Sequence, residues 1–120
     1  MIEYISLEDA LALIQDLSVG PVRDLGLLDS AIYRPQSTLF GSEAYQSIDE
    51  KCAALLQSLV HNHPLVDGNK RLGWLATVVF FKIKGITIEG DDDDIYDTVI
   101  AVASNKIEFS QLVAKLTSWH

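Results

Sequence analysis

The sequence predicts an all-α fold, a compact bundle of six helices that takes up residues 1–120 as one domain. Apolar residues recur at intervals of three and four in six separate segments, which is the spacing of one helical face. Short connections join these segments, and few stretches alternate as a strand would. A chain of 120 residues with 48% apolar composition can bury a core without disulfides.

Two helices are predicted in the first part of the chain. Ser6 is a favourable N-cap, and apolar residues then recur at helical spacing to Leu17. Asp24 is placed to cap a second helix, which stops before Pro35 because the residue preceding a proline disfavours helical backbone. Residues 35–47 lack a sustained period and are rich in turn-forming residues, so we expect an exposed loop or a short hairpin there.

Two long helices are predicted in the middle of the chain. One runs from about Ile48 to His61 and carries its apolar residues on one face. The next runs from Asn69 to Lys84, where Gly85 provides a stop. This helix is apolar nearly all round, which is typical of a helix at the centre of a bundle.

Two shorter helices complete the prediction. Residues 86–89 suggest a short extended segment, and a fifth helix follows the acidic run Asp91–Asp94, which we interpret as a solvated helix start favoured by the dipole. The last helix runs from about Phe109 to Ser118. Trp74 and Trp119 are expected in the core.

The charge and the cysteine usage limit the classes of function. Nine basic residues face seventeen acidic ones, for a net charge of −8, which argues against a direct nucleic-acid partner or an anionic membrane surface. Cys52 is the only cysteine and is expected to be a small buried hydrophobe, and this usage fits a reducing compartment. With no signal-peptide pattern and no bilayer-spanning run, we expect a soluble cytoplasmic protein.

The connection HNHPLVDGNKR, residues 61–71, carries an unexpected charge pattern. Lys70 and Arg71 lie where a helix begins, although the positive end of the helix dipole disfavours cations there. Gly68 permits a tight turn, and the backbone N–H groups of Gly68 and Asn69 have no intrahelical partner. Two cations, free N–H groups and a dipole end describe an anion site, most often for phosphate.

Two neighbouring residues extend this hypothesis, and a structural alternative stays open. Asp67 is a candidate helix cap and, beside phosphate, a candidate ligand for Mg²⁺. His63 is a candidate general base near neutral pH. Alternatively, Asp67 only caps the helix, Gly68 only shapes the turn and the cations face water. The spacing of His61 and His63 disfavours zinc, because positions two apart on a helix point in different directions.

The run HPLVDGNKR resembles the signature of the Fic/Doc family. The matching positions are His63, Asp67, Gly68, Asn69, Lys70 and Arg71. The segments VRDLGLLDSAIYRPQ and KGI resemble the Doc branch of the family, so the resemblance extends over most of the chain. Leu65 replaces the usual phenylalanine, which packs the loop into the core. Trp74 stands where adenylylating members carry a second phosphate-binding arginine.

The resemblance implies a six-helix Fic/Doc-type bundle and a toxin of a type II toxin–antitoxin system. Such a toxin would transfer the γ-phosphate of ATP to a threonine of elongation factor Tu and arrest translation. Gly68 and Asn69 would offer backbone or amide donors to the phosphates. Lys70 and Arg71 would neutralise charge in the transition state.

The same resemblance assigns the remaining roles. His63 would take the proton of the attacking hydroxyl, and Asp67 would hold Mg²⁺. Residues 35–42 would form the flap that aligns the target peptide. The sequence has no inhibitory helix with the family pattern of Ser or Thr, three residues, then Glu and Gly or Asn. Inhibition in trans by a separate antitoxin, which covers the groove near the motif, is therefore expected.

Two alternatives to the kinase remain. The first is protein adenylylation, and Lys70 and Trp74 favour phosphate transfer over it, since adenylylating members carry Gly and Arg at these positions. The second is an inactive binding module that keeps the Fic fold.

Overall fold

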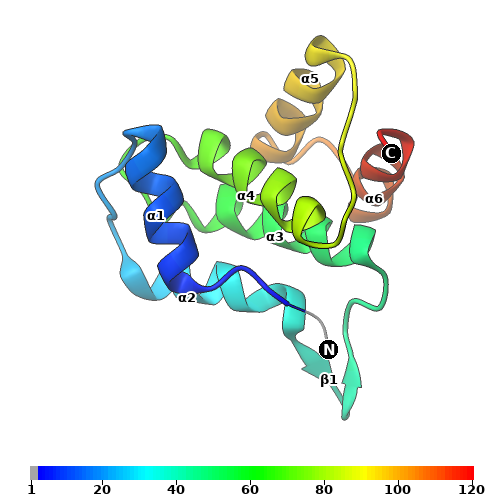
Figure 1. Ribbon diagram of the computed structural model, residues 1–120, viewed down its shortest axis with the longest axis horizontal. Coiled ribbons are helices and arrows are strands. Elements are labelled where there is room, and N and C mark those ends of the chain that lie inside the picture. Colours follow the sequence, from blue (N-terminus) through cyan, green and yellow to red (C-terminus); the bar gives the residue numbers. More distant parts are fainter. Residues whose placement is uncertain (1–2) are drawn as a thin grey trace.

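The computed structural model describes residues 3–120, which form a helical bundle with one small hairpin (Figure 1). Within these residues there are six α-helices, as predicted. The elements are α1 (Leu7–Leu17), α2 (Leu25–Tyr33), the 3₁₀-helix η1 (Arg34–Gln36), β1 (Thr38–Leu39), β2 (Ser42–Glu43), α3 (Ile48–Asn62), α4 (Asn69–Ile83), α5 (Asp92–Ala103) and α6 (Phe109–Ser118).

The helices α3 and α4 lie side by side at the centre of the bundle (Figure 1). Figure 1 places α1 and α2 on one side of this pair and α5 and α6 on the other. Gly73 of α4 allows the close approach, because a Cβ there would lie 3.1 Å from Val60 and 3.2 Å from Leu56 of α3. The expectation that α4 is central is therefore confirmed, because it contacts α1, α3 and α5. Its apolar residues on several sides pack against these neighbours.

Side chains cap the helices where the sequence predicts helix starts. Ser6 and Ser47 each form a capping box at the start of α1 and α3. Asp24 accepts from the Leu27 backbone N–H at the start of α2. These bonds satisfy N–H groups that have no partner within the helix.

The start of α5 differs from the prediction in its boundary and in the contacts of Asp94. Residues 86–89, expected as a short extended segment, lie outside any helix or strand, and the backbone N–H of Glu89 donates to Trp119 O at 2.7 Å. The acidic run does not precede the helix, because Asp91 is the N-cap and the next three residues form the first turn. Asp94 is also not merely solvated, since it accepts from Lys115 Nζ at 2.7 Å and from Trp119 Nε1 at 3.1 Å.

The hairpin predicted as one option for residues 35–47 is present. Its strands β1 and β2 pair antiparallel, with Thr38 opposite Glu43. Phe40 at the tip is 99% exposed. Lys51 of α3 anchors the base of the hairpin: its side chain is 1% exposed, donates to Tyr45 O and lies 3.4 Å from a carboxylate oxygen of Glu43.

The hairpin and the motif loop lie at different ends of α3. Lys51 precedes His63 by twelve residues, which is about 18 Å along a helix. In Figure 1 the hairpin projects from the bundle near the start of α3, and the motif loop leaves from the other end. The strands of the segment expected to act as the flap thus lie near the start of α3, whereas Ser37 of the same segment lines a hollow together with His61 and Asn62, close to the other end of this helix.

The expected core residues are placed as follows. Cys52 is fully buried, and this burial raises the pKa of its thiol. Trp119 is buried, whereas Trp74 is half-buried and packs edge-on against it, with the ring centroids 5.8 Å apart. Among the described residues, none of the helices has the length and apolar content needed to cross a membrane.

Candidate functional site

The motif loop, residues 63–68, joins α3 to α4 and is held by a segment distant in sequence. Residues 20–24 run beside it, and Val22 and Leu65 form an antiparallel bridge. Four backbone hydrogen bonds of 2.7–3.1 Å join the two segments. Because these bonds fix the loop backbone, the side chains that project from it have defined positions.

Arg23 holds the end of α3. His63 adopts a left-handed backbone conformation there, with φ 53°, and its carbonyl accepts from Arg23 Nη2 at 2.6 Å and from Arg23 Nε at 3.0 Å. The cation satisfies a carbonyl without an intrahelical partner and complements the negative end of the helix dipole. Arg23 therefore positions the backbone that carries His63. Sequence reasoning missed Arg23, because this contact spans forty residues and leaves no local pattern.

The side chain of Asn69 is buried and is used inside the protein. Its Nδ2 donates to Leu65 O at 3.0 Å, and its Oδ1 accepts from the Leu65 backbone N–H at 2.9 Å. Of the backbone and amide donors expected to meet phosphate at Asn69, the backbone N–H is the one without an intrahelical partner. Leu65 is fully buried, as expected for the residue in place of phenylalanine.

Gly68 is required by the turn into α4. It is the N-cap of this helix and has φ 95°, a conformation that residues with a side chain rarely adopt. A Cβ at this position would lie 2.5 Å from Cβ and Cγ1 of Val19. Both the backbone angle and the contact with Val19 therefore select glycine.

The structure corrects the expectation that Asp67 caps α4. Gly68 occupies the cap position, and no side chain of residues 3–120 makes a cap hydrogen bond there. Asp67 lies one residue too early, because the capping side chain belongs to the residue directly before the helix. Its carboxylate is instead 81% exposed and lies 3.4 Å from Nη2 of Arg71, which is 59% exposed.

The first turn of α4 has the properties of an anion site. Its N–H groups lack intrahelical partners, and Lys70 and Arg71 are exposed beside them. Both cations border a mainly apolar cleft of 260 Å³ between α4 and α5. The other residues that line this cleft are Trp74, Asp92, Ile95, Tyr96, Val99 and Ile100.

His63 opens into a different hollow from the two cations. Its exposed side chain lines a space of 370 Å³ together with Val60, His61, Ala103 and Asn105. The helix α5 borders both hollows, the cleft along its length and this space at its end. The six predicted site residues thus lie in one loop and the following helical turn, with His63 and the cations facing separate spaces.

The carboxylates near the loop suit one kind of magnesium site. Within residues 3–120 there is no group of three or more His, Cys, Asp or Glu side chains that could hold a metal ion. Asp67 presents one exposed carboxylate, and Mg²⁺ is commonly held by one or two carboxylates together with substrate phosphates. The residues therefore fit a magnesium ion that is shared with a phosphate group, and they do not form a cage of protein ligands.

Comparison with known proteins agrees with the resemblance seen in the motif. The chain matches the model of the Fic/DOC family over residues 4–81, which is more than half of its length and includes the motif loop. A curated relative from Mycolicibacterium smegmatis, named Toxin Doc, is 42% identical over 124 residues that cover 99% of this chain and 95% of the relative. The protein belongs to the Fic/DOC family.

Proposed function

We propose that this protein is the toxin of a toxin–antitoxin system and transfers the γ-phosphate of ATP to a hydroxyl group of another protein. The observation that carries the proposal is the first turn of α4, where Lys70 and Arg71 flank free N–H groups beside an apolar cleft. Family membership and the name of the 42% identical relative, Toxin Doc, support the proposal of a toxin.

The nucleotide would bind across the start of α4. Its phosphates would accept from the free N–H groups, and Lys70 and Arg71 would neutralise their charge. The adjacent cleft has apolar and aromatic walls, with Trp74 and Tyr96 among them, and 260 Å³ is enough for a nucleobase. Arg71 would exchange its weak contact with Asp67 for the phosphates, at little cost because both side chains are exposed.

The reaction would proceed by in-line transfer from ATP to the acceptor hydroxyl. His63 takes the hydroxyl proton while the oxygen–phosphorus bond forms and the bond to the β–γ bridging oxygen breaks, which leaves ADP. Lys70 and Arg71 stabilise the charge that gathers on the bridging oxygen. Magnesium, held by Asp67 and phosphate oxygens, would supply further positive charge there.

The protein target is proposed from the resemblance to the Doc branch of the family. We propose a threonine of elongation factor Tu as acceptor, so that modification arrests translation in the cytoplasm. A cognate antitoxin would inhibit the protein in trans by covering the groove near the motif loop. Adenylylation of a protein is the competing reaction, and an inactive binding module is the competing protein class.

The test uses ATP labelled at either the α or the γ phosphate, with purified elongation factor Tu as acceptor. We expect label on the acceptor only from the γ position and its loss in His63→Ala. The control is His120→Ala, because His120 contacts Asp49 and Phe81 away from the loop. If the acceptor retained label only from the α position, the reaction would be adenylylation and not phosphate transfer. Full toxicity of His63→Ala in growing bacteria would favour the binding module.

A further inference from the structure

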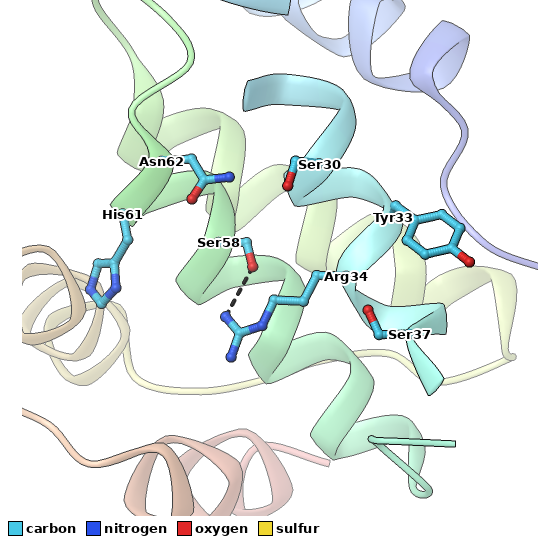
Figure 2. Close-up of a pocket in the computed structure, with 7 residues that line it drawn as sticks. All are labelled: Ser30, Tyr33, Arg34, Ser37, Ser58, His61 and Asn62. Atoms are coloured by element: carbon cyan, nitrogen blue, oxygen red, sulfur yellow. Dashed lines mark hydrogen bonds between the residues drawn. The ribbon is translucent and has the colours of Figure 1, made fainter. Parts of the chain in front are cut away.

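A further hollow, lined mostly by polar side chains, lies on the face formed by α2, η1 and α3 (Figure 2). It measures 410 Å³, and none of its lining residues is acidic. The lining residues are Ser30, Tyr33, Arg34, Ser37, Ser58, His61 and Asn62. In Figure 2 the guanidinium of Arg34 lies in front of α3, with its hydrogen bond to Ser58 drawn. We call this space the Arg34 pocket.

The guanidinium of Arg34 is held in one orientation. Its Nε donates to Tyr45 Oη at 2.8 Å, and its Nη1 donates to Ser58 Oγ at 2.9 Å. The rings of Tyr45 and Phe109 lie 5.4 and 5.8 Å from its central carbon. A cation fixed in this way is preorganised, so binding a ligand costs little side-chain entropy.

The charge of Arg34 is not neutralised within the part of the chain that the structure describes. No salt bridge joins it to a carboxylate there, and Nη2 makes no hydrogen bond to residues 3–120. No polar side-chain atom in these residues is both fully buried and without a partner, so Nη2 keeps access to solvent. A half-buried cation with one open donor favours an anion in the pocket.

The surrounding groups select a carboxylate. Ser30, Ser37 and Tyr33 bring hydroxyl groups to the lining, and hydroxyls can donate to an anion. Arg34 has already used two of its nitrogens on Tyr45 and Ser58, so one nitrogen and neutral hydroxyls remain. This set matches a singly charged carboxylate better than a doubly charged phosphate, which usually meets several cations.

The Arg34 pocket lies on the route between the hairpin and His63. Ser37, which directly precedes β1, lines it at one side, and His61 lines both this pocket and the hollow that contains His63. Ser58 precedes His63 by five residues, or about 8 Å of helix. An extended peptide advances about 3.3 Å per residue, so about two to four residues would link the two places.

We propose that the Arg34 pocket binds an acidic side chain of the protein substrate, about two to four positions from the hydroxyl that reaches His63. This inference rests on the proposed function and adds a determinant of substrate choice to it. Arg34 acts here as a specificity residue that touches the substrate and takes no part in the chemistry.

A threonine-centred peptide library tests the proposal, with each flanking position set in turn to Glu, Gln or Lys and label supplied by γ-labelled ATP. The wild-type protein should label the Glu peptide about tenfold faster than the Gln peptide at one position in that window, as for a charge-assisted hydrogen bond. Arg34→Gln should bring this ratio of Glu to Gln labelling close to one. Equal labelling of Glu and Gln peptides by the wild-type protein would overturn the proposal.

A second pair of variants avoids the packing role of Arg34. Ser30 is exposed on α2 and lines the pocket, so Ser30→Asp places a competing carboxylate there without disturbing the core. It should abolish the Glu preference, whereas the neutral and equally large Ser30→Asn should keep it. A Glu preference that survives in both Ser30→Asp and Arg34→Gln would overturn the assignment.

Peptide binding separates this proposal from the proposed function. If the wild-type protein labels no peptide, the proposal of phosphate transfer fails. Fluorescence anisotropy of the same peptides, carrying a fluorophore, then tests whether the Arg34 pocket binds a carboxylate. Binding of the Glu peptide about tenfold tighter than the Gln peptide, lost in Arg34→Gln, would support a carboxylate site. Equal binding of both peptides would contradict it.

Discussion

The side-chain amide of Asn69 pairs with the backbone of Leu65 through two hydrogen bonds, one to its carbonyl oxygen and one from its N–H. Leu65 is fully buried, so neither backbone group has water as an alternative partner. This pairing closes the motif loop over the start of α4. It places a residue of the family signature in the scaffold of the loop, next to the N–H groups that would meet phosphate.

Asn69→Ala should destabilise the protein by about 2–3 kcal/mol, because it leaves two buried backbone groups of Leu65 without partners. Urea unfolding followed by circular dichroism measures this change. Asn69→Asp should also destabilise, since a carboxylate cannot donate to Leu65 O. The neighbouring exposed change Lys70→Ala should stay within about 0.5 kcal/mol of wild type. Equal stability of Asn69→Ala and Lys70→Ala would show that the pairing does not hold the loop.

Gly68→Ala should cost more than Gly85→Ala, although both glycines have positive φ, 95° and 79°. At Gly85 a Cβ meets nothing within 4 Å, so the cost is the backbone strain alone, about 1 kcal/mol. At Gly68 the added Cβ also meets Val19 at 2.5 Å, which should raise the loss by about 1–3 kcal/mol. Thermal unfolding of the two variants compares them directly. Equal losses would mean that the loop can move away from Val19.

Asp67→Asn should alter the magnesium requirement and leave stability nearly unchanged. The contact with Arg71 is exposed and 3.4 Å long, and such pairs contribute about 0–1 kcal/mol. Loss of the carboxylate should raise the magnesium concentration for half-maximal phosphate transfer about tenfold. The matched control is the exposed Asp97→Asn on α5. An unchanged magnesium requirement in Asp67→Asn would remove this residue from the metal site.

Asp94 should contribute stability that depends on pH. Hydrogen bonds from Lys115 and Trp119 lower the pKa of its carboxyl group. Because the folded pKa is the lower one, the contribution is complete above about pH 4, the ordinary value of an unfolded Asp, and is lost as the pH falls through the folded pKa. The difference in melting temperature between wild type and Asp94→Asn should therefore shrink below about pH 4.

Asp93→Asn serves as the control for that measurement. Asp93 lies in the same helical turn and is exposed, so it shares the favourable dipole position without the contacts of Asp94. At neutral pH, the melting temperature of Asp93→Asn should differ less from that of the wild type than the melting temperature of Asp94→Asn does. A pH-independent difference for Asp94→Asn would mean that the contacts of Asp94 are not maintained in solution.

The amino-acid sequence by itself determined the helices and the position of the motif loop between α3 and α4. Capping residues such as Ser6 and Asp24 act within three residues, and apolar spacing acts within one or two helical turns, so both can be read locally. The motif also marked the loop, since His63 and Arg71 belong to one continuous run. Local sequence patterns did not place Asp67 correctly, because Gly68 and not Asp67 is the N-cap of α4.

Only the tertiary structure decided how the loop is held and what lies around it. Arg23 reaches the His63 carbonyl across forty residues, and Arg34 reaches Ser58 across twenty-four. Such contacts form because carbonyl groups at helix ends and partly buried cations need polar partners, which distant segments of the chain can supply. The sequence supplies these groups, and the packing of the helices chooses which of them meet.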